Sequence, residues 1–345
     1  MSANQGDHTT PTTTNTNTNT NTTTTTTTTT SPIPSRNANA NASPAAQSGC
    51  LPTNPSDPDD PLDYTRPPFP YVPGACFDIK PHNPPPPFDG VITRQIRCGQ
   101  DFGVQLVECH LGDTKAKLVA KIFDPLYVFD DEWHSPTYFS ERYYSSEAAA
   151  YMRIKKRGLD GKFTPKSHGC WFFEIPVRIN GDREVRREVR LILQEFIPGD
   201  TMEALIASVD VRMEVMAQLL EMHSKLAFIG VWQEDRYSRN VMVGKDSQDK
   251  WRVTLIDFSH SSVMGLETSK FSWRRPWHED DELPISPIAI CDGHWPVRPV
   301  EDIEEHWIDK KYRTRRERHR WMDQRWGKSS GRSNQYQPVG KSQLV

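Results

Sequence analysis

Three short runs of apolar residues between positions 91 and 123 begin the folded part of the chain. Residues 91–96 (VITRQI), 103–108 (GVQLVE) and 117–123 (KLVAKIF) are rich in Val, Ile and Leu, and polar or glycine residues separate them. Runs of this kind are typical of β-strands. Three of them with short connections predict a β-meander, which Asp124-Pro125 ends because proline does not fit inside a sheet.

A helical period follows over residues 138–156. Tyr144, Ala148 and Tyr151 recur at intervals that place them together on a helix, and the run of alanines around them has a high helix propensity. The pattern therefore predicts one helix after the third strand, with Glu147 inside it.

Two further strands are predicted over residues 171–177 and 186–196. Asn180-Gly181 between them indicates a hairpin, because both central residues of a type I′ turn need positive φ. Five strands with one inserted helix predict a small antiparallel lobe over residues 91–198.

The second half of the chain is predicted to be a short, mainly helical lobe over residues 199–326. Apolar periodicity favours helices at 201–209 and 211–228, and a short hairpin follows whose second strand ends in LIDFS at 255–259. Residues 301–325 are predicted to form a last helix, acidic at its start and basic later, which suits the helix dipole. The predicted fold class is α+β with two lobes.

The flanking segments are predicted to be unfolded. Residues 1–60 are almost entirely Thr, Asn, Ser, Ala and Pro, so they have too little apolar surface to offset the entropy of ordering. Residues 61–90 are a Pro-rich linker whose aromatic side chains dock on the folded body, although Pro84–Pro87 could instead bind a proline-recognising protein partner. Residues 327–345 are rich in Gly, Ser and Gln and are predicted to be disordered.

Composition narrows the possible functions. The chain has 345 residues, a net charge of −3, 35% hydrophobic residues and six scattered cysteines. The cysteines predict free thiols in a reducing compartment rather than a metal site. No apolar run of about 18 residues and no secretory signal are present, so we expect no membrane association and a cytoplasmic or nuclear location. We interpret the basic run 310–320 as a solvated helix face rather than a nucleic-acid patch.

Three polar residues in the second half could support phosphate chemistry. Asp235 and Asn240 lie five residues apart in a loop, and Asp257 ends the strand that follows. Phosphoryl transfer needs one carboxylate near the attacking hydroxyl, together with a carboxylate and an amide oxygen that hold Mg²⁺ against the phosphates.

The motifs, taken in their order along the chain, resemble those of the protein-kinase-like superfamily. They are VAKI at 119–122, QED at 233–235 followed by Asn240, and DFS at 257–259. They are most similar to the divergent fungal protein-kinase-like group, which is related to aminoglycoside and choline phosphotransferases. The resemblance covers residues 91–260 well and the remainder loosely.

This resemblance implies a role for each residue. Lys121 would hold the α- and β-phosphates of ATP, aligned by Glu147 on the helix, with Glu141 as the alternative partner. Asp257 and Asn240 would bind Mg²⁺. Asp235 would accept the proton of the acceptor hydroxyl or orient that hydroxyl.

Two further elements of the family are less complete. Residues 194–197 fall where the family hinge offers backbone groups to adenine, which implies Glu195 and Ile197 as cofactor contacts. Gly99 and Gly103 retain only part of the glycine-rich loop.

The chain also departs from the family at several positions. Gln233 replaces the loop histidine, Tyr237 takes the place of a cation near the γ-phosphate, and Ser259 replaces a glycine that can adopt positive φ. Arg236 or Arg239 could supply the missing cation. No APE-like element follows.

Three functional hypotheses remain. The first is an ATP- and Mg²⁺-dependent phosphotransferase that acts on a hydroxyl acceptor, most simply a protein Ser or Thr. The second is a pseudokinase interaction module that binds nucleotide without transfer. The third is a small-molecule kinase of the aminoglycoside-phosphotransferase type, which the short distal lobe and the absent APE element favour.

Overall fold

The computed structural model describes most of the chain after residue 69, and the residues from Asp59 to Val345 form one compact unit. The segment 1–60, the Asn180-Gly181 turn and the Pro84–Pro87 run lie outside the described residues. The described residues are 70–81, 88–99, 102–112, 116–128, 135–179, 183–266, 281–291, 295–298 and 300–339.

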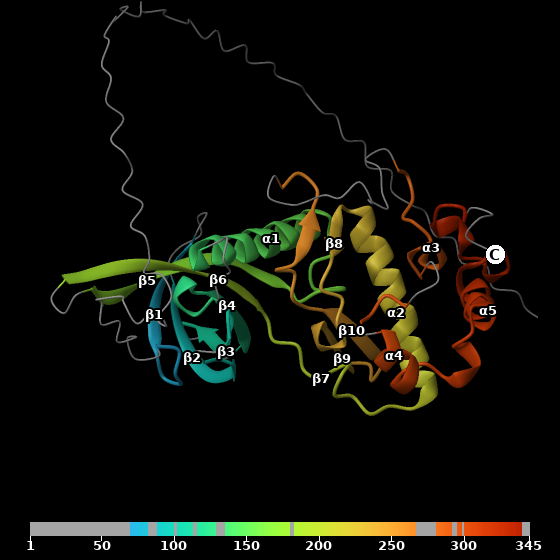
Figure 1. Cartoon of the computed structure of the whole chain (residues 1–345), viewed down its shortest axis with the longest axis horizontal. Helices are drawn as coiled ribbons and strands as arrows, with labels where there is room; N and C mark the ends of the chain where they lie inside the picture. Colours follow the sequence, from blue (N-terminus) through green and yellow to red (C-terminus); the bar gives the residue numbers. More distant parts are fainter. Residues whose placement is uncertain are drawn as a thin grey trace, which may run out of the picture. The chain divides into compact units, whose positions relative to one another are not determined.

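The first half is built on a closed antiparallel sheet of six strands in the order β1-β2-β3-β4-β6-β5 (Figure 1). The meander and the following hairpin were predicted as strands. The strands are β1 (Cys76–Pro81), β2 (Phe88–Arg97), β3 (Gln105–Leu111), β4 (Leu118–Phe123), β5 (Ser167–Ile179) and β6 (Arg183–Glu195).

The predicted five-stranded layout is wrong because β1 adds a sixth strand. This strand comes from the segment 61–90, which was assigned to a linker, so the lobe begins before residue 91. Cys76 pairs with Val91 of β2, and at the other edge Pro81 pairs with Trp171 of β5, which closes the sheet. Pro81 is tolerated because it stands at the end of its strand.

Alternation along β4 separates two hydrophobic cores. Ala120 and Ile122 point into the closed sheet, whereas Lys121 and Phe123 point to the opposite side, because successive side chains on a strand alternate. The interior of the sheet holds an apolar cavity of only about 30 Å³. The sheet is therefore a filled core and leaves no room for a ligand.

The segment before β1 is anchored to the sheet by a buried polar cluster. Tyr71 Oη donates a hydrogen bond of 2.5 Å to Asp124 Oδ2, and Arg187 Nη2 lies 2.6 Å from the same oxygen. Tyr71 also packs against Phe77 and Phe173. The expectation that aromatic side chains of this segment dock on the folded body is confirmed.

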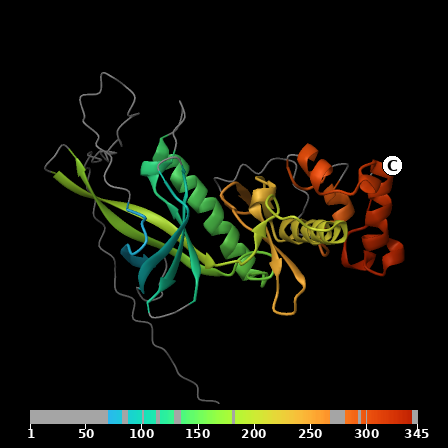
Figure 2. The same ribbon diagram turned by 90° about the horizontal axis from the view of Figure 1, so that it is seen from below.

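The long helix α1 (Pro136–Lys156) lies alongside the closed sheet in both ribbon views (Figures 1 and 2). A short 3-10 turn, η1 (Pro125–Tyr127), leads toward it. Ser135 caps the helix by accepting a hydrogen bond from Tyr138 N at 3.3 Å, and proline occupies its first turn, as such positions favour. The helix predicted at 138–156 is confirmed.

The described residues of the second half form four α-helices (α2–α5), four 3-10 turns (η2–η5) and two small sheets. The β-elements pair as β10-β9-β7 and β11-β8. The helix predicted at 201–209 is wrong: Thr201 pairs with Met242 in a two-residue strand, and a turn follows in which Ala204 N and Leu205 N both donate to Thr201 O. The elements in this stretch are β7 (Asp200–Thr201), α2 (Val209–Phe228), β8 (Val231–Gln233), η2 (Ser238–Asn240), β9 (Val241–Lys245), β10 (Trp251–Leu255) and β11 (Ser261–Val263).

The helix predicted at 301–325 is divided into two. Thr314 begins the second part by capping Glu317 N, and a separate cap at Asp309 starts the turn before it. The elements are α3 (Pro287–Cys291), α4 (Val300–His306), η3 (Lys310–Tyr312), α5 (Arg315–Trp326), η4 (Lys328–Ser330) and η5 (Ser333–Gln335).

The prediction of a disordered tail from residue 327 is wrong for residues 327–339. Tyr336 is only 3% exposed, and Gln337 N donates a hydrogen bond of 2.8 Å to Pro284 O. One buried aromatic side chain therefore fixes a segment whose polar composition suggested disorder.

The second hydrophobic core joins α1 to the helices of the second half. Four tryptophans of the described residues are buried in it: Trp295, Trp307, Trp321 and Trp326. The basic run 310–320 contributes Arg318, which is buried and lies 3.2 Å from Glu304 Oε1. None of the helices in the described part of the chain combines the length and apolar character that a membrane crossing requires.

Candidate functional site

A buried lysine forms the centre of the site. Lys121 projects from β4 on the side away from the closed sheet, and its side chain is 5% exposed. Its Nζ contacts Glu147 Oε2, lies 2.7 Å from Asp257 Oδ1 and donates a hydrogen bond of 2.8 Å to Ser259 Oγ. Three residues from distant parts of the sequence therefore surround one ammonium group.

Glu147 is the helix partner of Lys121, and the alternative Glu141 is not. Glu147 is fully buried, and its Oε1 accepts a hydrogen bond of 3.0 Å from Gln194 Nε2. Glu141 instead pairs with Arg190 at 3.1 Å on the surface of α1. The carboxylate thus has a hydrogen-bonding partner for each of its oxygens.

Burial and charge act in opposite directions on this cluster. Burial alone would lower the pKa of Lys121, but the charges of Asp257 and Glu147 outweigh it and raise that pKa. Burial raises the pKa of Glu147. Burial also opposes ionisation of Asp257, yet Lys121 and Ser259 hold the pKa of this carboxyl well below its usual range. Lys121 and Asp257 are therefore both charged at neutral pH.

The strained backbone of this region lies at Asp257 and not at Ser259. Asp257 has φ of 61°, in the left-handed region that Asp tolerates better than most residues. Ser259 has no positive φ, so the glycine it replaces is not needed for backbone freedom. Its Oγ instead donates to Asp257 Oδ1 at 2.7 Å or to Glu147 Oε2 at 2.9 Å.

Gln233 takes over the fixing of the loop that carries Asp257. Its Nε2 donates hydrogen bonds of 2.7 Å to Ile256 O and 2.8 Å to Asp257 O. Gln233 also ends β8, which pairs with β11 just beyond Ser259. The glutamine therefore ties the two loops of the site together.

The second cluster of the site is centred on Asp235, whose side chain is 19% exposed. Asn240 Nδ2 donates hydrogen bonds of 2.9 Å to both Asp235 Oδ2 and Asp235 O. Arg239 Nη2 lies 3.2 Å from Oδ1 and 3.1 Å from Oδ2 of the same carboxylate. The two clusters are linked by the backbone, because Ile256 N donates a hydrogen bond of 2.9 Å to Asn240 O.

Arg236 and Arg239, the two candidates for the cation that is missing near the γ-phosphate, have different surroundings. Arg239 lies 4.0 Å from the ring of Tyr237 and contacts Asp235 directly. Arg236 stacks instead on Trp232 at 5.1 Å, and its pKa is lowered by burial and by the charge of Arg298. Arg239 is therefore the cation that lies at the Asp235 carboxylate.

The glycine loop is closed internally. Gly99 N donates a hydrogen bond of 2.8 Å to Gln105 Oε1, and Gln105 Nε2 donates to Gly99 O at 3.0 Å and to Phe102 O. Gly99 has φ of 144°, whereas Gly103 needs no positive φ. Because Gln105 already occupies Gly99 N, that group is not available to a phosphate.

At the hinge, Glu195 and Ile197 differ in their backbone contacts. Glu195 N donates a hydrogen bond of 2.9 Å to Lys166 O, and the Glu195 side chain accepts one of 3.0 Å from Lys166 N. Ile197 lies two residues after Glu195, the last residue of β6, and its backbone groups bond to no other backbone group in the described part of the chain. Of the two, Ile197 is therefore the hinge residue whose backbone N–H and C=O groups could bind adenine.

The oxygen donors of the site suit Mg²⁺, which prefers carboxylate and amide oxygens. Asp257 is 30% exposed at its side chain, and Asn240 donates through its nitrogen, which leaves its amide oxygen as an acceptor. Among the described residues no group of three or more His, Cys, Asp and Glu side chains could hold a metal ion. Phosphate and water oxygens would therefore have to complete the coordination shell.

The sequence missed three of these contributions. The sequence indicates Ser259 only as a replacement for glycine and Gln194 only as part of the hinge, and it indicates no role for Gln105. Gln194 could have been found from strand alternation, because it lies two residues after Ile192 on the side of β6 that faces Glu147.

Comparison with known proteins gives similarity to protein kinase domains at low identity. The chain is similar to the ROP18 kinase domain in complex with AMP-PNP and sucrose (16% identity, TM-score 0.39, covering 56% of this chain and 58% of that one). It is also similar to the PknI kinase domain of Mycobacterium tuberculosis (16% identity, TM-score 0.32, covering 50% of this chain and 60% of that one). A third similar structure is a Rio2 kinase–ADP/Mg²⁺-phosphoaspartate complex from Chaetomium thermophilum (16% identity, TM-score 0.34, covering 52% of this chain and 51% of that one).

The chain thus spans about half to three fifths of the length of these matched structures. No family model matches the chain, and no curated protein matches it.

Proposed function

We propose that this chain is a phosphotransferase of protein-kinase-like fold that uses ATP and Mg²⁺ and transfers the γ-phosphate to a hydroxyl acceptor. The observation that carries this proposal is the Lys121 cluster. A fully buried carboxylate and a second, partly exposed carboxylate meet one buried ammonium group. Burying these charges costs free energy, and such clusters are found preferentially at functional sites. We therefore expect Lys121 to bind a phosphate ligand as well as the two carboxylates.

Different residues of the site would bind different parts of the nucleotide. Lys121 would contact the phosphates, and Glu147, held by Gln194, would keep the lysine charged and in place. Asp257 and Asn240 would hold Mg²⁺, which when bound neutralises the charge that develops on the phosphates. The free backbone groups of Ile197 would face the adenine.

On the acceptor side, Asp235 would accept the proton of the attacking hydroxyl at its carboxylate. Asn240 and Arg239 orient that carboxylate. Arg239 is 45% exposed and could turn toward the γ-phosphate when the acceptor enters. We propose a protein Ser or Thr as the acceptor. A small-molecule acceptor remains the alternative, because α3, α4 and α5 are short.

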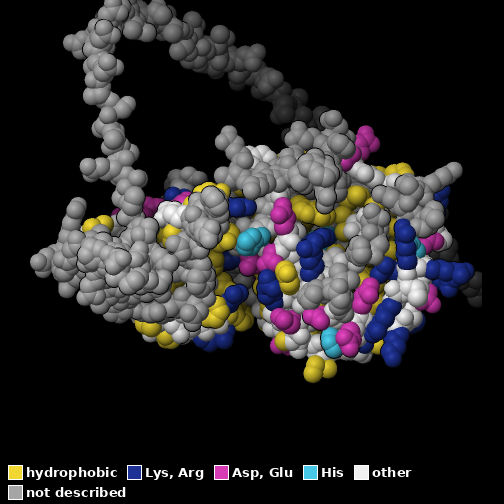
Figure 3. All heavy atoms as spheres, viewed as in Figure 1, with side chains coloured by type: hydrophobic (Ala, Val, Ile, Leu, Met, Phe, Trp, Pro, Cys, Tyr) yellow, Lys and Arg dark blue, Asp and Glu magenta, His cyan; other side chains and the backbone are white. Residues whose placement is uncertain are grey.

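A second candidate function is a nucleotide-binding pseudokinase. The observation that favours it is the Asp235 carboxylate, both of whose oxygens are already engaged by Arg239 and Asn240. In that case the molecule would present a surface to a protein partner. On the face shown in Figure 3, acidic and basic side chains are interspersed over the second half, so that face does not favour a nucleic-acid partner.

The whole 345-residue chain can be tested by its thermal shift with ATP and Mg²⁺ and by its ATP turnover. Asp257→Ala should abolish the Mg²⁺-dependent shift, whereas Asp235→Ala should keep the shift and lower turnover by a factor of about 100 or more. Glu203→Gln, which changes an exposed carboxylate, is the matched control.

The absence of any Mg²⁺-dependent shift in the unchanged protein would refute the nucleotide site. A shift without turnover would favour the pseudokinase. Turnover that requires an added Ser- or Thr-containing protein would support the first acceptor class, and turnover with small alcohols alone would support the second.

A further inference from the structure

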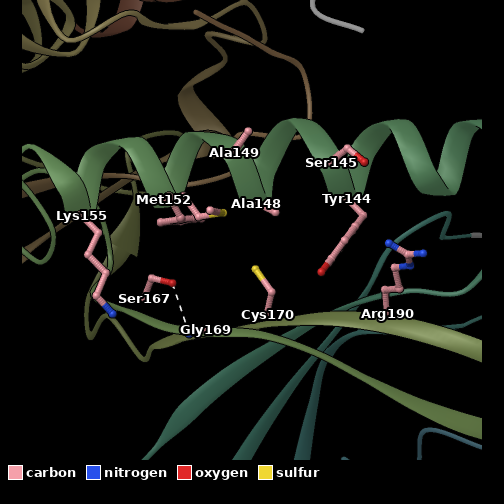
Figure 4. A pocket seen from close by; sticks show the side chains of 11 residues that line it. Tyr144, Ser145, Ala148, Ala149, Met152, Lys155, Ser167, Gly169, Cys170 and Arg190 are labelled. Atoms are coloured by element: carbon pink, nitrogen blue, oxygen red, sulfur yellow. Dashed lines mark hydrogen bonds between the residues drawn. The ribbon is translucent and has the colours of Figure 1, made fainter. Parts of the chain in front are cut away.

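A groove separates α1 from the start of β5. Its volume is about 420 Å³, within the range of small-ligand sites. Figure 4 shows Tyr144, Ala148, Met152 and Lys155 pointing from the helix toward the strands, with Cys170 on the opposite wall. These helix positions share one face because they are three or four residues apart.

The middle of the groove is apolar and open because small residues line it. Ala148 contributes only a methyl group on the helix side, and Gly169 contributes no side chain on the strand side. Gly169 has φ of 104°, which disfavours a side chain at this position. Met152 lies at the rim and is 62% exposed, a large fraction for an apolar side chain.

The charges at the groove are all positive. Lys155 lies at one end and Arg190 at the other (Figure 4), and no Asp or Glu is among the lining residues. Arg190 is already paired with Glu141 at 3.1 Å and with Glu188 at 3.4 Å. Lys155 is exposed and forms no ion pair within the described part of the chain. One cation is thus available to an entering group.

The thiol in the groove does not favour a covalent site. Burial raises the pKa of Cys170 above its ordinary value, so the group is a neutral thiol at neutral pH. Burial and the nearby thiol likewise raise the pKa of Tyr144. The two neutral groups hydrogen-bond to each other, so neither supplies a nucleophile.

We propose that this groove binds a small amphipathic anion, non-covalently. The apolar body of the ligand would lie along Ala148 and Met152, and its carboxylate or phosphate would pair with Lys155. Apolar burial supplies most of the affinity, and the half-exposed ion pair sets the orientation.

The groove adjoins the Lys121 cluster. Glu147 lies between Tyr144 and Ala148 in the sequence of α1, and Gly169 pairs with Leu193 next to Gln194. A ligand that bridges α1 and β5 would therefore stabilise the position in which Glu147 reaches Lys121. This effect on turnover rests on the proposed function, whereas binding itself does not.

Binding is tested with the whole 345-residue chain in the absence of nucleotide, so its outcome is independent of catalysis. Anilinonaphthalene sulfonate, an apolar fluorophore with one anionic group, is titrated first. It is then displaced with decanoate, decyl phosphate or the uncharged decanol. We expect saturable binding that decanoate displaces at lower concentration than decanol does. Whichever of decanoate and decyl phosphate displaces the fluorophore at the lower concentration carries the preferred anionic group.

Two lysine variants then locate the site. Lys155→Gln should weaken displacement by decanoate about three- to tenfold, whereas Lys156→Gln, the adjacent exposed lysine outside the groove, should leave it unchanged. Equal potency of decanoate and decanol, or equal losses in both variants, would overturn the proposal.

A third variant blocks the groove. Ala148→Phe, checked for folding by circular dichroism, should abolish displacement, and a folded variant that still binds decanoate would also overturn the proposal. If this variant does not fold, the pair of lysine variants decides. A rise in ATP turnover with decanoate, lost in Lys155→Gln, would extend binding to regulation.

Discussion

The two halves of the candidate site are held in different ways. Around Lys121, the buried ammonium group, the fully buried carboxylate of Glu147 and the partly exposed carboxylate of Asp257 come from β4, α1 and the loop after β10, and their charges compensate one another. Around Asp235 the carboxylate is partly exposed, and it is held by neighbours within five residues of sequence. The first half depends on the whole fold, whereas the second half depends on one loop.

This difference separates stability from chemistry. A charge removed from the Lys121 cluster leaves another buried charge without compensation, so the protein should lose stability as well as nucleotide binding. A charge removed from the Asp235 cluster is replaced by water, so the protein should lose only transfer. The following three variants test that contrast.

Lys121→Met should have the largest effect. It leaves the buried carboxylate of Glu147 unpaired, and we expect the free energy of unfolding to fall by about 3–5 kcal/mol in urea titrations. Lys117→Met, next to the same strand but 65% exposed, should change it by less than about 0.5 kcal/mol. Similar small losses in both variants would show that the cluster is not tightly coupled.

Arg239→Gln should affect the reaction far more than the stability. Its loss removes the cation at the Asp235 carboxylate, so kcat should fall about 10- to 100-fold while the free energy of unfolding changes by less than about 1 kcal/mol. Steady-state kinetics and urea unfolding measure the two quantities. A rise in kcat would instead mean that Arg239 blocks the carboxylate and must leave before transfer.

Asp257→Asn should change the free energy of unfolding by an amount that depends on pH. The folded pKa of Asp257 lies below its ordinary value of 3.8, so its stabilising contribution is present above that pH and is lost as the pH falls through the folded pKa. The slope is at most about 1.4 kcal/mol per pH unit for one proton. Unfolding midpoints measured between neutral and acid pH should therefore converge for the two proteins, and parallel curves would contradict the assignment.

The sequence identified the residues of the site better than their contacts. Lys121, Glu147 and Asp257 were named together because their order along the chain resembles that of the kinase-like motifs, and the structure brings their side chains into contact. The role of Ser259 could not, because its hydroxyl contacts groups more than 100 residues away. Long-range pairing of this kind leaves no periodic pattern in the chain.

The fold was predicted best where periodicity was strong, as in β4, α1 and α2. The prediction was wrong where it relied on composition. The many prolines of residues 61–90 indicated a linker where β1 forms, and the polar composition after residue 327 indicated disorder where Tyr336 is buried. The helix expected at 201–209 failed because pairing with β9 fixes Asp200 and Thr201 as a strand and a turn takes up the residues that follow, so tertiary context overrode local helix propensity.

The closed sheet has a practical consequence for anyone who shortens this protein. A polypeptide that begins at Val91, where the apolar pattern first becomes clear, would lack β1 and the Tyr71 anchor. The sheet would then open, and β2 and β5 would each present unpaired backbone groups along an edge. Exposed strand edges recruit one another, so such a fragment should aggregate or exchange strands between copies. Retaining the residues from Asp59 onward avoids this hazard.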